Sequence, residues 1–511
     1  MMSLAEFLEH SRDYNLIPIY EEIAGDTITP ITVYSNLCLH EEYSYLLESA
    51  GQGRYSFIGV YPEFVINKKK EDLEISYYDD KGGFLESQLE VCELIDYMKD
   101  FINQYNLLEL EGLPPFSGGF VGYFAYEMIN DWEAMYHNED NKEIQQSDTP
   151  MSTLVYSSVI IAIDHFSHTV KIISNIRLHE EMSDSEKEGL YYSHKSKIDK
   201  VVKNIKELSI NGTVTNNNLE YPDDFSFGDI ESNTSKSEFA SMVNKAKDYI
   251  KEGDAFQIVL SQKFAIESNV PPFKLYRALR MMNPSPYLFY LNFPEIKLIG
   301  SSPEVLIKVE NKKVLTRPLA GTRPRGKNSQ EDLIYKEDLL SDEKEKAEHL
   351  MLVDLGRNDL GMVCKPGSVK VTELMDVEYF SRVMHIVSEV EGELADNYSS
   401  LDALKSVFPA GTVSGAPKIR AMEIIDELEK DPRGVYAGAV GYIDLKGNLD
   451  TCITIRTIYQ IEDKIFIQVG AGIVTDSVPE KEYDETLNKA RALFQSLKII
   501  REDGSYDLSY R

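Results

Sequence analysis

The grouping of strand-like segments is the sequence feature that most constrains the fold of this chain. Short segments with alternating apolar residues, among them 31–37, 64–79 and 152–176, follow one another with only occasional helices between them. More of them lie beyond residue 250, again in groups. Because parallel sheets need a crossover helix between successive strands, this grouping predicts an α+β fold with large, mainly antiparallel sheets and helices packed outside.

A polar stretch divides the chain. Asn, Ser, Asp and Gly replace the periodic apolar residues over roughly residues 208–237. We therefore expect an N-terminal domain over 1–210, a linker over 211–235 and a second domain over 236–511.

Helix signals follow the linker. Ser235 and Glu238 have the spacing of a capping box ahead of a periodic apolar face. The pattern also predicts helical structure over 328–360, a helix from near Pro417 and a last helix after Pro479.

The charge balance restricts the partners. The chain has 85 Asp and Glu residues against 53 Lys and Arg, a net charge of −32. Such a surface repels nucleic acids and anionic membranes, and no apolar run has the length of a membrane span. We therefore expect neither as a partner. An anionic substrate would need a metal, cations or backbone N–H groups concentrated at its site.

The spacing of the four cysteines and the first residues of the chain indicate the cellular compartment. Cys38, Cys92, Cys364 and Cys452 have neither zinc-site nor disulfide-framework spacing. The first residues lack the basic and apolar regions of a signal peptide. We expect reduced thiols and a cytoplasmic location.

Two acidic helices could direct carboxylates at one point. In the segment 341–361, Ala347, Leu350, Met351 and Leu355 are expected to face inward with Glu348 beside them. In the helix after Pro479, carboxylates recur at spacings of three and four, a pattern that could hold Mg²⁺. Glu482 and Glu485 are these carboxylates, and Lys489 lies on the same face of the helix. Spacing alone equally fits a solvated acidic face with an ordinary Glu485–Lys489 ion pair.

Glycines, a histidine and an arginine extend the candidate set. Gly470 and Gly472 interrupt an apolar strand, where glycine is tolerated if a backbone or ligand comes close. His385 could be a packed histidine or a catalyst. Arg456, which alternates with isoleucines in an expected strand, would suit a carboxylate ligand.

Taken together, these stretches resemble the chorismate-utilising enzymes, most closely the family of anthranilate synthase large subunits. The resemblance runs from about Pro18 to about Leu497. The shared segments stand in family order: LLES, GRYSFIG, PFSGGFVGY, DAFQIVLSQKF, NPSPYLFYL, GSSPE, PLAGTRPRG, EHLMLVDLGRNDLG, VMHIVSEVEG, FPAGTVSGAPK, YAGAVGYI, VGAGIV and PEKEYDETLNKA. The resemblance implies a two-layer β structure with outer helices, the chorismate-binding enzyme fold, with chorismate as substrate and Mg²⁺ as cofactor.

The resemblance also assigns roles to residues. It implies Glu348, Glu485 and Glu482 as metal ligands, and Glu304, His385 and Thr412 as catalytic residues. Glu304 matches the acid near the leaving hydroxyl, and His385 matches the histidine of the elimination step. The implied substrate-binding residues are Ala320, Gly321, Thr322, Tyr436, Arg456, Gly470, Ala471, Gly472 and Lys489.

Two positions bear on the product. Related enzymes that make 4-amino-4-deoxychorismate often carry a lysine where this chain has Ala320, and isochorismate and salicylate synthases carry a lysine base where it has Gln257. Both positions favour anthranilate. A synthase that stops at 2-amino-2-deoxyisochorismate stays open as an alternative, as does a silent sensor that kept the fold.

A partner and an inhibitor complete the expectations. No G-x-C-x-G motif surrounds any cysteine, so we expect no fused amidotransferase. The resemblance implies a separate glutamine amidotransferase subunit, the second component of anthranilate synthase, and hence a hetero-oligomer. It also implies a tryptophan inhibitor site formed with a contribution from the N-terminal domain: Glu48, Ser49, Pro286, Tyr287, Leu288, Val440 and Tyr442. Core packing is the alternative for these residues.

Overall fold

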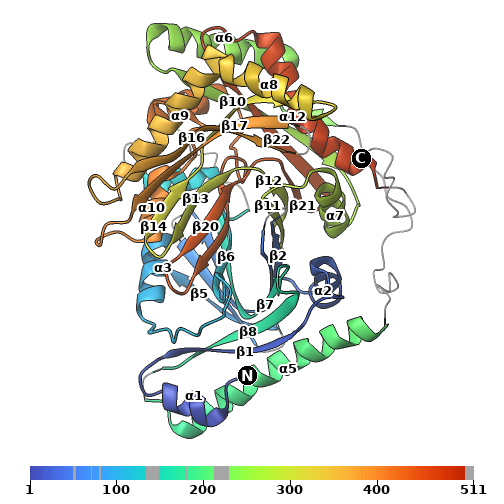
Figure 1. Ribbon diagram of the computed structural model, residues 1–511, viewed down its shortest axis with the longest axis vertical. Helices are drawn as coiled ribbons and strands as arrows, with labels where there is room; N and C mark the ends of the chain where they lie inside the picture. Colours follow the sequence, from blue (N-terminus) through green and yellow to red (C-terminus); the bar gives the residue numbers. More distant parts are fainter. Residues whose placement is uncertain are drawn as a thin grey trace.

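Two long antiparallel strands, β3 (Tyr55–Lys69) and β7 (Ser152–Asp164), connect the two layers of the molecule (Figure 1). Their pairing shifts register between Pro62 and Phe64, next to Tyr61, whose φ is +55°. Such an irregularity bends a strand pair. On one side of the bend β3 pairs with β2 and β7 with β8, and on the other β3 pairs with β4 and β7 with β6. One strand pair thereby belongs to both sheets.

The pairings extend from β3 and β7 into two antiparallel sheets. The first runs β1 (Leu16–Ala24), β8 (Thr169–Arg177), β7, β3, β2 (Ser44–Glu48), β11 (Tyr287–Asn292), β12 (Lys297–Ser302), β21 (Thr457–Ile461), β22 (Lys464–Ile473) and β10 (Gln257–Glu267), with β9 (Glu231–Ser232) and β18 (Gly415–Ala416) beside β10. The second runs β5 (Phe84–Glu90), β4 (Asp72–Tyr78), β3, β7, β6 (Gly119–Phe124), β19 (Ala439–Asp444), β20 (Leu449–Ile453), β13 (Val305–Glu310), β14 (Lys313–Thr316) and β17 (Val383–Glu393), with β15 (Leu319–Pro324) and β16 (Lys370–Tyr379) beside β17.

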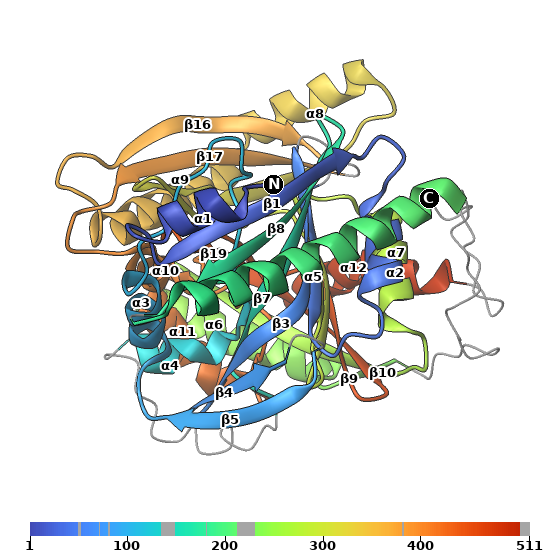
Figure 2. The same cartoon turned by 90° about the horizontal axis from the view of Figure 1, so that it is seen from below.

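Helices cover the outer faces, as the grouping of strands predicted. They are α1 (Leu4–His10), α2 (Pro30–Leu37), α3 (Leu94–Asn103), the 3₁₀ turn Tyr126–Met128, α4 (Ile129–Trp132), α5 (Asp184–Asn211), α6 (Lys236–Glu252), α7 (Pro272–Met282), α8 (Ser329–Ser341), α9 (Glu343–Gly361), α10 (Ser400–Val407), α11 (Lys418–Leu428) and α12 (Pro479–Lys498). Seen from below, α5 lies across β8 and β1 (Figure 2). Helices α6, α8, α9 and α12 gather at the opposite end (Figure 1).

The core between the sheets is made by residues of both. The first sheet contributes Tyr45, Phe57, Phe289 and Leu298, and the second Val121, Tyr123, Val440 and Cys452. All four cysteines are free thiols. The structure, a computed structural model, describes residues 1–49, 53–70, 72–79, 82–133, 149–179, 181–211, 230–380 and 383–500. Within these ranges no helix is both long and apolar enough to cross a bilayer.

The expected domain division stays a prediction. Strands from the first 210 residues pair directly with strands from the second half, β2 with β11 and β6 with β19. Of the expected linker, residues 212–229 lie outside the described part of the chain.

The capping-box helix is confirmed. Helix α6 begins after Ser235, whose side chain accepts the Glu238 N–H while the Glu238 carboxylate accepts the Ser235 N–H. The helices expected near Pro417 and after Pro479 are α11 and α12.

The helical structure expected over 328–360 is confirmed as two helices, α8 and α9, separated at Asp342, which caps α9.

Two local expectations are wrong. Residues 31–37 form helix α2 and not a strand, because Thr29 accepts the Thr32 N–H at a helix start that places Pro30 in the first turn. On α9, Ala347 and Leu350 are exposed, and the buried residues are His349, Leu352, Val353, Asp359 and Leu360.

Candidate active site

Glu304 is a buried acid between two strands. It lies in the short turn from β12 to β13 with 6% of its surface exposed. Burial raises its pKa to about 8, although the Leu319 N–H, the Thr412 hydroxyl and the nearby charges of Arg456 and Lys489 lower it. The Thr412 contact lacks hydrogen-bond geometry, so that buried hydroxyl remains free for another partner. At neutral pH Glu304 therefore holds a proton in a site with cations close by.

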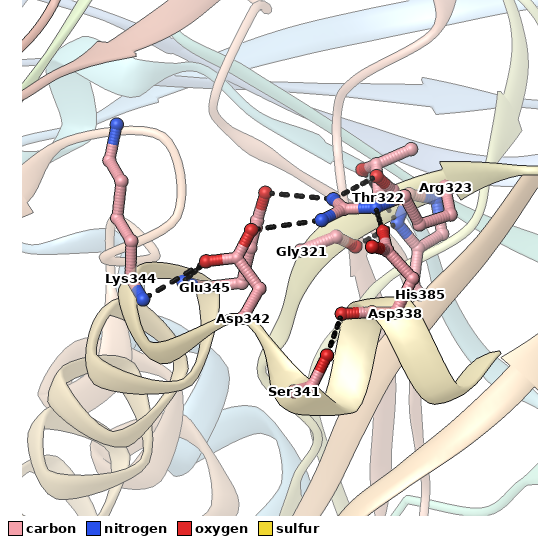
Figure 3. Close-up of polar contacts among 9 residues, drawn as sticks. All are labelled: Gly321, Thr322, Arg323, Asp338, Ser341, Asp342, Lys344, Glu345 and His385. Atoms are coloured by element: carbon pink, nitrogen blue, oxygen red, sulfur yellow. Dashed lines mark hydrogen bonds and ion pairs between the residues drawn. The ribbon is translucent and has the colours of Figure 1, made fainter. Parts of the chain in front are cut away.

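His385 is a neutral imidazole held by the Gly321 carbonyl (Figure 3). It lies on β17, opposite Thr322 of β15, and its Nδ1 is 2.9 Å from the Gly321 carbonyl oxygen and 3.1 Å from Thr322 Oγ1. Because a carbonyl can only accept, Nδ1 carries the proton and Nε2 keeps its lone pair. Burial lowers the pKa of His385 to about 4. The pair Glu304 and His385 thus offers a proton donor and a proton acceptor at the same pH.

The segment Leu319–Thr322 connects these two groups. Ala320 pairs with Ile386, Thr322 pairs with His385, and the register shifts between them at Gly321, whose φ is +67°. This bulge turns the Gly321 carbonyl towards His385, while the Leu319 N–H donates a hydrogen bond to the Glu304 carboxyl.

One wall of the site depends on the two glycines of β22. A Cβ at Gly470 would lie 2.6 Å from the Tyr436 hydroxyl, and one at Gly472 would lie 2.7 Å from Gln257 Nε2. A side chain at either position would have to displace these atoms, so the absence of a side chain lets them approach the strand closely. Ala471 points to the opposite face, where it packs in the core, so only its backbone can reach a ligand.

Arg456 and Lys489 supply positive charge. Arg456 lies in the bend between β20 and β21 with a φ of +49°, so its expected place within a strand is wrong. Burial lowers its pKa and Glu304 raises it. Lys489 Nζ donates to the Gly470 carbonyl at 2.8 Å and pairs with Glu485 Oε1 at 2.8 Å. The ordinary Glu485–Lys489 ion pair is thus present beside the acid and the histidine.

The glutamates of α9 and α12 face each other. Glu348 Oε1 accepts a hydrogen bond from Gln257 Nε2 at 2.6 Å, and its pKa is raised by burial and by Glu345 and Glu485. Burial and Glu485 also raise the pKa of Glu482. Among the residues described, no three His, Cys, Asp or Glu side chains form a ready metal cluster. Mg²⁺ usually takes only one or two carboxylates and keeps several waters.

A cavity of about 460 Å³ lies beside this site, between the sheets. All seven residues expected at an inhibitor site line it: Glu48, Ser49, Pro286, Tyr287, Leu288, Val440 and Tyr442. The Glu48 carboxylate is held by Arg280 and Tyr276 of α7, and the Tyr287 hydroxyl donates to Asp450 at 2.8 Å.

The cavity and the acid share a segment of chain. Pro303 and Val305, which flank Glu304, line the cavity. Leu319, whose N–H donates to the Glu304 carboxyl, also lines the cavity, as does Val387, two residues beyond His385. A group that enters the cavity would therefore press on the backbone that carries the acid.

Several site residues were not singled out from the sequence. Arg323 and Glu345 lie next to the Gly321 segment, and Asp450, Arg54 and Arg317 line the cavity. Arg54 and Arg323 do stand inside shared segments, GRYSFIG and PLAGTRPRG. Asp450 carried no signal, because its place at the cavity follows from the pairing of β20 with β13 and β19.

The fold agrees with the comparisons to known proteins. The family model for chorismate binding enzymes matches residues 42–495, so the chain belongs to that family. It is 45% identical over 505 residues to "Anthranilate synthase component 1" of Aquifex aeolicus, with 98% of each chain covered. The crystal structure of anthranilate synthase component I from Streptococcus pneumoniae TIGR4 superposes with a TM-score of 0.71 at 37% identity, covering 93% of this chain and 99% of that one. Escherichia coli MenF, a menaquinone-specific isochorismate synthase, has the same fold at 18% identity, with a TM-score of 0.68 and coverage of 97% and 98%.

Proposed function

We propose that this chain is the large subunit of an anthranilate synthase, which converts chorismate and ammonia to anthranilate and pyruvate, the first committed step of tryptophan synthesis. The observation that carries the proposal is the pair formed by protonated Glu304 and neutral His385, which both contact the segment Leu319–Thr322. Ala320 and Gln257 support it, because neither can act as the lysine nucleophile or base of the related enzymes. A cytoplasmic location stays a prediction.

Each group then has a part in two successive steps. Arg456 and the Tyr436 hydroxyl would hold the enolpyruvyl carboxylate, with the free Thr412 hydroxyl and the Gly470 and Gly472 backbone around the ring. As ammonia adds at C2, Glu304 would give its proton to the C4 hydroxyl, which leaves as water. The ammonium formed at C2 would give up a proton to solvent. His385 Nε2 would next take the C2 proton as the C3–O bond breaks, which leaves an aromatic ring, and the released enolpyruvate would take a proton from water to become pyruvate.

Mg²⁺ is the proposed cofactor, and the donors fit it. Burial, and then the nearby carboxylates of Glu345 and Glu485, raise the pKa of Glu348, as expected where a cation is missing from the charge balance. Gln257 Oε1 is buried beside them without a hydrogen-bond partner. When bound, Mg²⁺ would attach the ring carboxylate and draw electron density from the ring. Glu348 and Glu485 would hold the ion, and Glu482, near the start of α12, is the third proposed ligand.

Glu485→Gln tests this assignment. We expect the Mg²⁺ concentration for half-maximal activity to rise about 10-fold or more, since outer ligands alone already shift metal affinity by that factor. Calorimetric titration of Mg²⁺ into the protein measures the same loss without turnover. Glu480→Gln, on the exposed first turn of α12, is the control. Equal Mg²⁺ affinity in both variants would remove Glu485 from the ligand set.

The decisive experiment for the function mixes the purified chain with chorismate, Mg²⁺ and ammonium salt at mildly alkaline pH. Anthranilate fluorescence and pyruvate are followed together, and we expect equal amounts of both. Chorismate loss without pyruvate would identify a synthase that stops at the amino intermediate. No consumption of chorismate at all would favour the sensor alternative.

We further propose a glutamine amidotransferase subunit as the source of ammonia. Ammonia is mostly protonated at neutral pH, so delivery of the free base favours the reaction. Glutamine should support anthranilate formation only after that subunit is added, and pull-down from the native extract should recover it. Repeated recovery of the chain alone would count against a hetero-oligomer.

Tryptophan is the proposed inhibitor, with the cavity as its site. The aromatic side chains Tyr287, Phe289 and Tyr442 suit an indole, and carboxylates and arginines on the wall suit an amino acid's two charges. The charged lining residues are Glu48, Glu378, Asp450, Arg54, Lys308 and Arg317. Inhibition would follow from the shared segment Pro303–Val305, which carries Glu304.

Ser49→Phe tests the inhibitor site. Ser49 lines the cavity with little space to spare, since a Cβ at Gly53 would lie 2.1 Å from the Ser49 Cβ. A phenyl ring there should occupy the cavity and abolish tryptophan inhibition while most activity remains, measured as the tryptophan concentration for half inhibition. Ser167→Phe, in an exposed turn, is the control. Unchanged inhibition in Ser49→Phe would refute the assignment.

A further inference from the structure

Arg323 connects the Gly321 segment to helices α8 and α9 (Figure 3). Its guanidinium pairs with Asp338 of α8 at 2.5 Å, with Asp342 at 2.9 Å and with Glu345 of α9 at 3.3 Å. It also donates to the Thr322 carbonyl at 3.1 Å. Within the described ranges, no second cation forms an ion pair with any of these three carboxylates. Arg323 alone therefore offsets their mutual repulsion.

The carboxylates that Arg323 binds also have roles of their own near the Gly321 segment and His385. Asp342 is the N-cap of α9, where its other carboxylate oxygen accepts the N–H groups of Lys344 and Glu345. Glu345 also lies under the backbone bulge, since a Cβ at Gly321 would be 3.1 Å from its Oε2. The Gly321 carbonyl in turn accepts the His385 Nδ1 proton. Arg323 thus joins α8 and α9 to the Thr322 carbonyl, and the adjoining Gly321 carbonyl contacts the imidazole.

We propose that Arg323 is a positioning residue that holds the Gly321 carbonyl in place and thereby aims His385 Nε2 at the substrate. The inference rests on the proposed function, because it assigns Arg323 to the elimination step that His385 serves. The planar fork of arginine is what allows one side chain to reach three carboxylates and a carbonyl, and a lysine amine cannot reproduce that geometry.

The test follows both halves of the reaction in Arg323→Gln. Chorismate loss and pyruvate release are measured in the same ammonia-dependent assay, together with thermal unfolding. We expect pyruvate release to fall about 10- to 100-fold, as expected for a misplaced catalytic group, and to fall further than chorismate loss, so that an amino intermediate accumulates. Arg323→Lys should show the same imbalance to a smaller degree.

Arg420→Gln is the matched control. Arg420 also pairs with two carboxylates, Asp254 and Glu423, but on α11. This variant should release one pyruvate per chorismate consumed. If Arg323→Gln does the same, whether at the normal rate or with both halves slowed equally, the positioning role is overturned. If Arg323→Gln fails to fold, Arg323→Lys decides by the same ratio. A wild-type chain that makes no anthranilate would instead refute the proposed function.

Discussion

Glu304→Gln is expected to lower the rate of anthranilate formation by about 100- to 10,000-fold, the contribution typical of a positioned general acid. Glutamine keeps the size of the side chain and its hydrogen bond to the Leu319 N–H, but it has no proton to give to the leaving hydroxyl. The loss should fall on kcat more than on KM, since the substrate contacts assigned to Arg456 and Tyr436 are unchanged. Initial rates of anthranilate fluorescence measure it.

The pH dependence of activity tests the same role of Glu304 as a proton donor. Burial raises the pKa of Glu304 to about 8, and its protonated form is the active acid. Measured at a fixed concentration of free ammonia, wild-type activity should therefore be retained below that pH and should decline as the pH rises through it. Glu310→Gln, at the exposed end of β13, should keep both the rate and the profile. An unchanged decline in a still active Glu304→Gln variant would assign the acid to another group.

His385→Ala is expected to abolish pyruvate release while chorismate is still consumed. The imidazole is neutral, its Nδ1 proton is committed to the Gly321 carbonyl, and its Nε2 is the acceptor proposed for the elimination step. Alanine removes that acceptor, and a fall of about 100- to 10,000-fold in pyruvate release is the corresponding magnitude. The amination step, which depends on Glu304, should continue, so an amino intermediate should build up and be seen by chromatography.

The control for this variant is His179→Ala, an exposed histidine outside the site. It should form anthranilate and pyruvate at the wild-type rate. Because burial lowers the pKa of His385 to about 4, its titration should not affect the wild-type profile above about pH 5. Equal pyruvate and anthranilate from His385→Ala would show that another group takes the proton.

The fold class could be predicted because it depends on patterns that lie within short segments. Alternating strands and capped helices are local features, and α6 begins where Ser235 and Glu238 indicate. The errors arose where two local signals competed. In 31–37 the alternation of apolar residues suggested a strand, but Thr29 and Pro30 start a helix there. On α9 the apolar spacing placed Ala347 and Leu350 inward, but both are exposed.

The sequence by itself determined the α+β class and the start of helices such as α6, and its resemblance to a known family led to the site residues, which stay predictions. Only the tertiary structure decided how those residues act. The proton on Glu304 comes from burial by remote segments, and the free Nε2 of His385 comes from a bulge in a neighbouring strand. The Arg323 contacts and the cavity beside Pro303 likewise join residues far apart in the chain. Burial, register and charge proximity are properties of packing, and no local pattern encodes them.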